Sequence, residues 1–269
     1  MHELLITVLC VSFVSAFLLC PFNAHADTSC TLIVSYPEGE IIKQDGDCEQ
    51  RRSPASTFKL PLAVMGFDSG LLKDAQTPSL TYKDEYQSDM DIQKKTTDPA
   101  VWIKESIVWY SQQLTRKMGT ETFKDYIRKF SYGNMDLAGN AGKNDGLTHS
   151  WLMSSLSISP QEQVVFIKKL LECDLGVSEA ACAATIGITP EFQAGEWKVF
   201  GKTGSGRLKD VKEDVENFKP QGWFVGWANK SQKKVIFAKL VLEDRPSKEY
   251  GGPKARDAFL RELSRINVP

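Results

Sequence analysis

The chain has 269 residues, of which 33 are lysine or arginine and 34 are aspartate or glutamate, so its formal net charge is −1 at pH 7. A nearly neutral chain lacks the excess of basic residues typical of nucleic-acid-binding proteins, and we expect no nucleic-acid partner. Hydrophobic residues make up 42% of the chain, enough at this length for one large domain or two small ones around sizeable cores.

The beginning of the chain has the pattern of an export signal. Leu4 to Phe22 is almost wholly apolar and is followed by Ala24-His25-Ala26, a small-residue cleavage pattern. We expect residues 1–26 to be a signal peptide, so that residues 27–269 reach the periplasm without membrane attachment. The alternative is a retained membrane anchor. Met-His-Glu at the start lacks the usual basic residues, but the cleavage pattern argues against an anchor.

Four cysteines are left once residues 1–26 are excluded: Cys30, Cys48, Cys173 and Cys182. An even number of cysteines in an exported protein indicates disulfide bonds. The local pairing, Cys30 with Cys48 and Cys173 with Cys182, is one of three possible pairings, and free buried cysteines are the alternative. The spacings do not fit a zinc site and His149 is the only histidine left, so we expect no metal.

Apolar spacing and turn residues predict the elements in chain order. The expected elements are a strand hairpin over 31–34 and from 41, helices over about 54–70, 98–114, 120–130, 159–171 and 178–186, strands over 197–200, 222–227 and 235–242, and a helix over 253–266. Residues 73–98, 131–150 and 207–220 read as connections. This order predicts an α+β fold, with an antiparallel sheet of mixed strand order flanked by helices and an inserted all-helical subdomain. We expect one domain over 27–269, its sheet part over about 27–55 and 197–269 and its helical part over about 56–196.

The stretch from Ser53 to Lys59 combines a helix start with reactive side chains. Ser53 suits a helix cap and Pro54 suits a first helical turn. Positions i and i+3 share a helix face, so Ser56 would lie beside Lys59. One interpretation is a serine nucleophile activated by a lysine, and the other is a capping serine with a surface lysine. The first interpretation needs a neutral lysine, which only burial among apolar neighbours such as Phe58 provides.

The glycine-rich residues 201–206 also allow two interpretations. A phosphate-binding loop needs a glycine five residues before its Gly-Lys pair, but Glu196 stands there, and no helix is predicted to follow. The alternative is a strand edge, where Lys202 binds a carboxylate or a developing charge and Gly204 lets the backbone approach a substrate. The sequence favours the strand edge.

Taken together, these motifs resemble those of the serine β-lactamase and penicillin-binding protein superfamily, whose signatures are S-x-x-K, S-D-N and K-T-G. The motifs are Ser56-Thr57-Phe58-Lys59, Ser106-Ile107-Val108, Tyr132-Gly133-Asn134, Lys202-Thr203-Gly204 and Gly222-Trp223-Phe224-Val225-Gly226. Tyr132-Gly133-Asn134 stands in place of S-D-N, and the five motifs in this order, with Trp151 after the third, resemble those of the class D β-lactamases, or oxacillinases. The resemblance spans almost all of residues 27–269.

The resemblance implies a role for each matching residue. Ser56 would be the acylated nucleophile, Lys59 would be carboxylated by carbon dioxide and act as general base, and Ser106 would relay protons between Lys59 and Lys202. Backbone amides of Ser56 and Ser205 would form the oxyanion hole. The residues implied to bind substrate are Lys202, Thr203, Gly204, Ser205, Tyr132 and Arg256, with Lys254 as a rival to Arg256, and those implied to support the carboxylated lysine are Trp151, Val108 and Phe58.

The resemblance also implies partners and cofactors. The substrate would be a small-molecule β-lactam, the only requirement would be carbon dioxide or bicarbonate, and the protein would be a monomer or a weak homodimer that confers resistance. A penicillin-binding sensor that stays acylated and a peptidoglycan D,D-peptidase are the alternative functions. Read from the residues alone, Trp151 could be plain core, Ser106 an ordinary mid-helix serine and Tyr132 a turn aromatic.

The sequence offers few other groups to activate the water of a deacylation step. No aspartate or glutamate stands between Asp145 and Glu162, and Glu162 falls in the first turn of a predicted helix, where it complements the helix dipole. His149 reads as a surface loop residue. The base must therefore come from elsewhere, and a carboxylated Lys59 would supply it.

Overall fold

The computed structural model of the chain describes residues 29–88, 90–208, 219–244 and 249–268. The predicted signal peptide, residues 1–26, and most of the predicted 207–220 connection lie outside these described residues. Within the described part, no helix combines the length and apolar character needed to span a bilayer.

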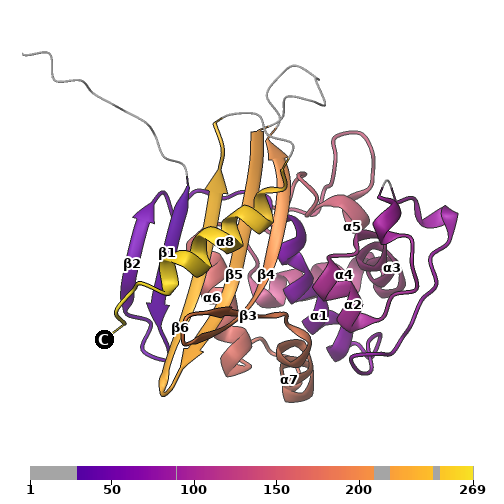
Figure 1. Cartoon of the computed structure of the whole chain (residues 1–269). Helices are drawn as coiled ribbons and strands as arrows, with labels where there is room; N and C mark the ends of the chain where they lie inside the picture. Colours follow the sequence, from indigo (N-terminus) through magenta and orange to yellow (C-terminus); the bar gives the residue numbers. More distant parts are fainter. Residues whose placement is uncertain (1–28, 89, 209–218, 245–248, 269) are drawn as a thin grey trace, which may run out of the picture.

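A six-stranded sheet, entirely antiparallel, forms the centre of the fold (Figure 1). The strands are β1 (Cys30–Ser35), β2 (Ile41–Gly46), β3 (Glu191–Ala194), β4 (Trp197–Leu208), β5 (Lys219–Lys230) and β6 (Lys233–Leu242), and their order across the sheet is β2-β1-β6-β5-β4-β3. The N-terminal hairpin therefore pairs with the last strand of the chain, which makes the strand order mixed, as predicted.

Helices cover both faces of the sheet, so its central strands are apolar almost throughout. In Figure 1, α8 (Gly251–Leu263) crosses the front face and α6 (Pro160–Glu172) lies behind the sheet. Under α8, Phe259 stacks on Phe237 with ring centroids 3.8 Å apart. Because β5 alternates its side chains, Phe224 joins this front core while Trp223 and Val225 join the larger core on the other face.

The remaining helices form a block beside β4 at one side of the sheet (Figure 1). The α-helices are α1 (Lys59–Asp68), α2 (Pro99–Glu105), α3 (Val108–Met118), α4 (Thr120–Phe130), α5 (Gly146–His149) and α7 (Glu179–Ile188), and the short 3-10 helices are η1 (Ala55–Phe58), η2 (Asp84–Tyr86) and η3 (Asp91–Gln93). This confirms the predicted α+β fold. Cys30–Cys48 and Cys173–Cys182 are both bonded, which confirms the local disulfide pairing.

Several boundaries differ from the sequence predictions. The expected helix over 98–114 is two helices, α2 and α3, that break at Ser106. The glycine-rich residues 201–206 continue β4, because pairing with β5 extends from Lys198 to Leu208. β3 was not predicted, since its four residues have little apolar pattern and gain their order from pairing with β4. The short α5 lies within the expected loop, and α8 begins at Gly251.

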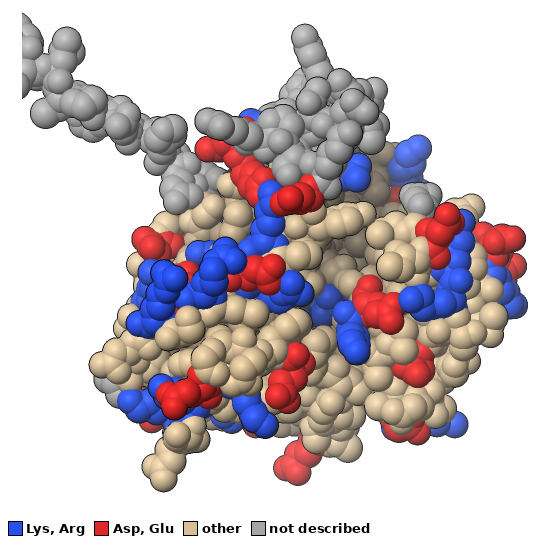
Figure 2. Space-filling view, in the orientation of Figure 1, with Lys and Arg blue, Asp and Glu red and all other residues tan. Residues whose placement is uncertain are grey.

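Basic and acidic side chains are interspersed over the face that α8 crosses (Figure 2). Two lysines, from β2 and β6 on either side of β1, converge on one helix carboxylate there: Lys43 Nζ lies 2.6 Å and Lys239 Nζ 3.3 Å from the carboxylate of Glu262. These partly buried ion pairs fasten α8 to the sheet. They thereby keep α8, the helix on the front face of the sheet, in place against β4.

Candidate active site

Ser56 and Lys59 lie at the start of the first helical segment, where η1 passes into α1. The Lys59 Nζ and Ser56 Oγ atoms are 3.2 Å apart, so the spacing of three residues brings the two groups together as expected. Ala55, directly before Ser56, has φ +48°, a left-handed conformation that costs free energy for any residue but glycine. The strained backbone thus lies next to the reactive hydroxyl.

Ser53 does not cap this helix, contrary to the sequence interpretation. η1 has no side-chain cap, because the Ser53 hydroxyl bonds instead to the backbone of Trp151 and Met153. The helical segment also opens as a 3-10 turn, and α1 proper begins at Lys59.

Lys59 is enclosed, with only 1% of its surface exposed. Burial, together with repulsion from nearby Lys202, lowers the pKa of the Lys59 amine well below 10.5. The buried amine thus gives up its proton more readily than an exposed lysine, which is the direction that a nucleophile-activating lysine requires.

Lys202 is the second buried lysine of the site and projects from β4. Its Nζ donates to Ser106 Oγ at 3.0 Å and to the Thr203 carbonyl at 2.9 Å. It is 2% exposed, and desolvation lowers its pKa to about 7. Close to neutral pH this amine therefore changes between its charged and uncharged forms.

Ser106 occupies the break between α2 and α3 and has φ +63°. Reading it as an ordinary mid-helix serine is therefore wrong. Two hydrogen bonds to Gln93 hold the start of α3: Gln93 Oε1 accepts from the Val108 amide at 3.0 Å, and the Gln93 carbonyl accepts from the Trp109 indole at 2.7 Å. Gln93 thereby fixes the turn that presents Ser106 to Lys202.

An aromatic wall stands beside the nucleophile. The rings of Phe58 and Trp151 stack with centroids 5.0 Å apart and an interplanar angle of 19°. Both residues are buried, and no hydrogen bond among the described residues uses the Trp151 indole N–H. The Trp151 ring is thus buried, while its indole N–H is left available as a donor within the described part of the chain.

Tyr132 lies behind this wall. Its ring meets Phe58 edge-on at 5.5 Å and Phe166 at 5.4 Å, and its buried hydroxyl lies beside Thr57 and Gln163. Burial raises the pKa of this hydroxyl. The side chain of Tyr132 therefore supports Phe58 from the core.

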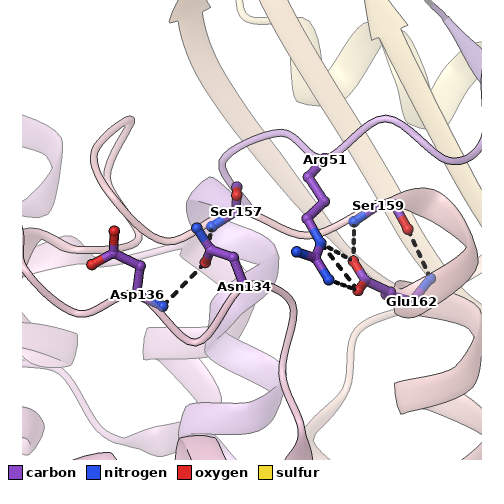
Figure 3. Close-up of polar contacts among 6 residues, drawn as sticks. All are labelled: Arg51, Asn134, Asp136, Ser157, Ser159 and Glu162. Atoms are coloured by element: carbon purple, nitrogen blue, oxygen red, sulfur yellow. Dashed lines mark hydrogen bonds and ion pairs between the residues drawn. The ribbon is translucent and has the colours of Figure 1, made fainter.

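The other two residues of the motif connect loops. Gly133 has φ +56°, and a Cβ there would lie 2.1 Å from the Ser157 carbonyl oxygen. Asn134 Oδ1 accepts from the backbone amides of Asp136 at 3.2 Å and Ser157 at 3.0 Å (Figure 3). The motif thus fastens the loop after α4 to the segment that follows Trp151.

Glu162 is fully engaged at the start of α6 (Figure 3). Its carboxylate accepts from the Ser159 amide at 2.8 Å, while Ser159 Oγ accepts from the Glu162 amide at 3.2 Å, which is a capping box. Arg51 also binds this carboxylate, with Nε at 3.0 Å, and helps to lower its pKa. This confirms that Glu162 has a helix-capping role.

The K-T-G segment packs closely on the nucleophile segment. A Cβ on Gly204 would lie 2.9 Å from the Pro54 carbonyl oxygen and 3.2 Å from the Thr57 amide nitrogen. The glycine is therefore needed for the close contact between β4 and η1. Next to it, Ser205 Oγ accepts from the Gly252 amide at 2.9 Å and joins β4 to α8.

Arg256 and Lys254 have different surroundings on α8. Arg256 lines a pocket of about 530 Å³ together with Lys202, Thr203 and Phe192, and its guanidinium lies 5.4 Å from the Phe192 ring centroid. Arg256 also pairs with Asp257 at 2.7 Å, whereas Lys254, which does not line this pocket, pairs with Glu243 at 2.8 Å and Glu249 at 3.0 Å. The structure therefore favours Arg256 as the cation beside the K-T-G segment.

A larger pocket, of about 630 Å³, lies between α4 and residues 135–147 and contains none of these groups. Within the described ranges, no cluster of three or more histidine, cysteine, aspartate or glutamate side chains could hold a metal ion.

Comparison with known proteins agrees with this arrangement. The family model described as the penicillin binding protein transpeptidase domain matches residues 30–174 and 180–265. The chain is 47% identical over 236 residues to beta-lactamase OXA-9 of Klebsiella pneumoniae, covering 87% of this chain and 86% of that protein. The chain belongs to the class D β-lactamases.

Two further relatives give the same family. Beta-lactamase OXA-1 of Escherichia coli is 33% identical over 223 residues, covering 82% of this chain and 78% of that protein. The crystal structure of OXA-427 class D β-lactamase matches with a TM-score of 0.79 and 41% identity, covering 89% of this chain and 100% of that chain. The protein is thus a class D serine β-lactamase, a hydrolase of the β-lactam amide.

Sequence reasoning missed two supporting residues of this class D β-lactamase. Gln93 lay in a stretch read as a polar connection, and Ser53 was read as a helix cap. Each acts through two hydrogen bonds to residues distant in the chain. No local pattern signals such a contact, so only the folded chain could identify them.

Proposed function

We propose that this class D β-lactamase works through an acyl-Ser56 intermediate, with Lys59 carboxylated on Nζ as general base in acylation and deacylation. The observation that carries the proposal is the buried Lys59 amine, 3.2 Å from Ser56 Oγ. The glutamate that follows the middle motif is occupied in a capping box, so the site needs another base.

The residues around Lys59 fit a carboxylated lysine. Carbon dioxide adds only to a neutral amine, and burial lowers the pKa of Lys59 accordingly. Phe58 is buried beside it and Val108 is half-buried, while the uncommitted Trp151 indole N–H provides a donor for an anion. When present, a carboxylate there would supply a base for the Ser56 hydroxyl and later for water.

The remaining side chains have defined tasks in acylation. Ser56 Oγ attacks the β-lactam carbonyl carbon, the ring C–N bond breaks, and the leaving nitrogen takes up a proton. Ser106 accepts a hydrogen bond from Lys202, so its own proton can be passed to that nitrogen. The backbone amides of Ser56 and Ser205 would form the oxyanion hole.

Substrate binding would use the cations next to β4. Lys202, Thr203 and Arg256 line one pocket, which suits the carboxylate that penicillin-type molecules carry. Thr203 lines this pocket, whereas Ser205 accepts from the Gly252 amide and is not one of the lining residues.

We further propose that residues 27–269 form one catalytic domain that acts in the periplasm after residues 1–26 are removed. A monomer or weak homodimer without membrane attachment would then meet its substrate directly. The support for export is the apolar leader with its Ala24-His25-Ala26 site and the two disulfides.

The test is hydrolysis of a penicillin and a chromogenic cephalosporin by purified residues 27–269, with and without added bicarbonate. We expect multiple turnovers, faster with bicarbonate, and no turnover in Ser56→Ala. We expect Lys59→Ala to form little acyl-enzyme or to trap it. Acylation of one equivalent without turnover would contradict hydrolysis and would favour the sensor function.

A further inference from the structure

Ser53, three residues before the nucleophile, joins two distant parts of the chain. Its side chain is 9% exposed. Its Oγ donates to the Trp151 carbonyl at 2.9 Å and accepts from the Met153 amide at 2.9 Å. One hydroxyl therefore bonds both ends of the turn Trp151–Met153.

The neighbours of Ser53 are attached to the same region by other contacts. Arg52 and Ile158 exchange two backbone hydrogen bonds, both 2.9 Å long. Arg51 binds the Glu162 carboxylate at the start of α6 (Figure 3). These contacts hold the backbone before Ser56 independently of the Ser53 hydroxyl.

The Ser53 carbonyl is fixed to the sheet in turn. It accepts from Gln221 Nε2 at 2.7 Å and from Trp223 Nε1 at 2.9 Å, both on β5. A substitution that changes only the Ser53 side chain leaves these two bonds in place. Such a substitution therefore acts on the Trp151–Met153 turn.

The turn needs restraint to keep its shape. Met153 has φ +55°, a conformation that non-glycine residues adopt only where the surroundings hold them. Trp151, at the other end, stacks on Phe58, and Phe58 is next to Lys59 in the chain. A shift of the turn would tilt the indole relative to the Lys59 amine.

We propose that Ser53 is a positioning residue for Trp151, whose hydroxyl holds the Trp151–Met153 turn so that the indole N–H faces Lys59 Nζ. Ser53 thereby sets how tightly Lys59 retains carbon dioxide. This inference rests on the proposed carboxylation of Lys59. It assigns to Ser53 an effect on carboxylation beyond its effect on folding.

The experiment measures Lys59 carboxylation by ¹³C NMR in a titration with ¹³C-bicarbonate at fixed pH. We expect Ser53→Ala to need about tenfold more bicarbonate than wild type for half occupancy, as one charge-assisted hydrogen bond is weakened. Ser53→Thr, which keeps the hydroxyl, should stay close to wild type. Arg51→Gln is the matched control: it loosens the same segment through an exposed contact and should leave half occupancy unchanged.

A double-mutant cycle separates positioning from general loosening. If Ser53 acts through the indole N–H, Ser53→Ala should add nothing to the defect of Trp151→Phe. The inference would be overturned if Ser53→Ala raised the bicarbonate needed for half occupancy by the same factor in wild type and in Trp151→Phe. It would also be overturned if Ser53→Ala alone needed no more bicarbonate than wild type. Should Ser53→Ala not fold, Ser53→Cys fills the same space with a weaker donor, and the same two criteria apply to it. Absence of a carbamate signal in wild type would instead refute the proposed function.

Discussion

Replacing Lys202 by methionine should change how the stability of the protein depends on pH. Methionine fills a similar space but carries no charge, so it removes the buried amine whose pKa is about 7. The unfolded chain keeps that proton up to its ordinary pKa of 10.5. Between these two values the unfolded state binds more protons, so the wild-type amine makes stability rise with pH in this window.

The size of the effect follows from the two pKa values. Between about pH 7 and pH 10.5 the Lys202 amine should raise the free energy of unfolding by on the order of 5 kcal/mol, at ~1.36 kcal/mol for each pH unit between the two pKa values. Between about pH 7 and about pH 9 the expected rise is about 2 kcal/mol, because the amine is already half deprotonated at the lower pH. Below the folded-state pKa the contribution no longer changes with pH.

The assay is urea unfolding of wild type and Lys202→Met at about pH 7, 8 and 9, with disulfides intact. The buffer is depleted of bicarbonate, because an anion on Lys59 would raise the pKa of Lys202. Lys198→Met, at an exposed position of the same strand, is the control. We expect the stability difference between wild type and Lys202→Met to grow in favour of wild type as pH rises. A difference that stays constant would refute the buried, easily deprotonated amine.

Three further predictions concern binding and support of the site. Arg256→Ala should raise KM for a penicillin by about tenfold or more, because the substrate loses a charged partner, while Lys254→Ala should leave KM unchanged. The same KM in steady-state kinetics for Arg256→Ala and Lys254→Ala would contradict this assignment. Gln93→Leu should lower kcat by about tenfold and stability by about 1 kcal/mol, because the Val108 amide at the start of α3 loses its side-chain acceptor. An unchanged kcat would exclude the positioning role. Gly204→Ala should lower the free energy of unfolding by about 1–3 kcal/mol and remove most of the activity, because the new Cβ meets the Pro54 carbonyl. A variant with wild-type thermal unfolding and kinetics would count against this packing.

The local part of the site could be predicted from sequence. Ser56 and Lys59 are close because helical spacing places them there, and this spacing survives even though the first turn is a 3-10 helix. Both disulfides could also be predicted, since each closes a short loop. Strand patterns likewise identified β5 and β6, whose apolar runs are long.

What sequence could not provide depends on contacts between distant segments. The break at Ser106 has no proline or glycine to mark it, and it is fixed by Gln93, fifteen residues before Val108. The burial of Tyr132 depends on Phe58 and Phe166 lying on either side of its ring. The strand through residues 201–206 forms because β5 supplies hydrogen-bond partners that outweigh the low strand preference of glycine.

A crystal structure of residues 27–269, grown near neutral pH with bicarbonate, shows whether Lys59 is carboxylated and so able to serve as the base. We expect carboxylate density on Lys59 Nζ, with one oxygen within hydrogen-bond distance of the Trp151 indole nitrogen. A bare Nζ in a protein that turns over substrate in the same buffer would contradict this role of Lys59.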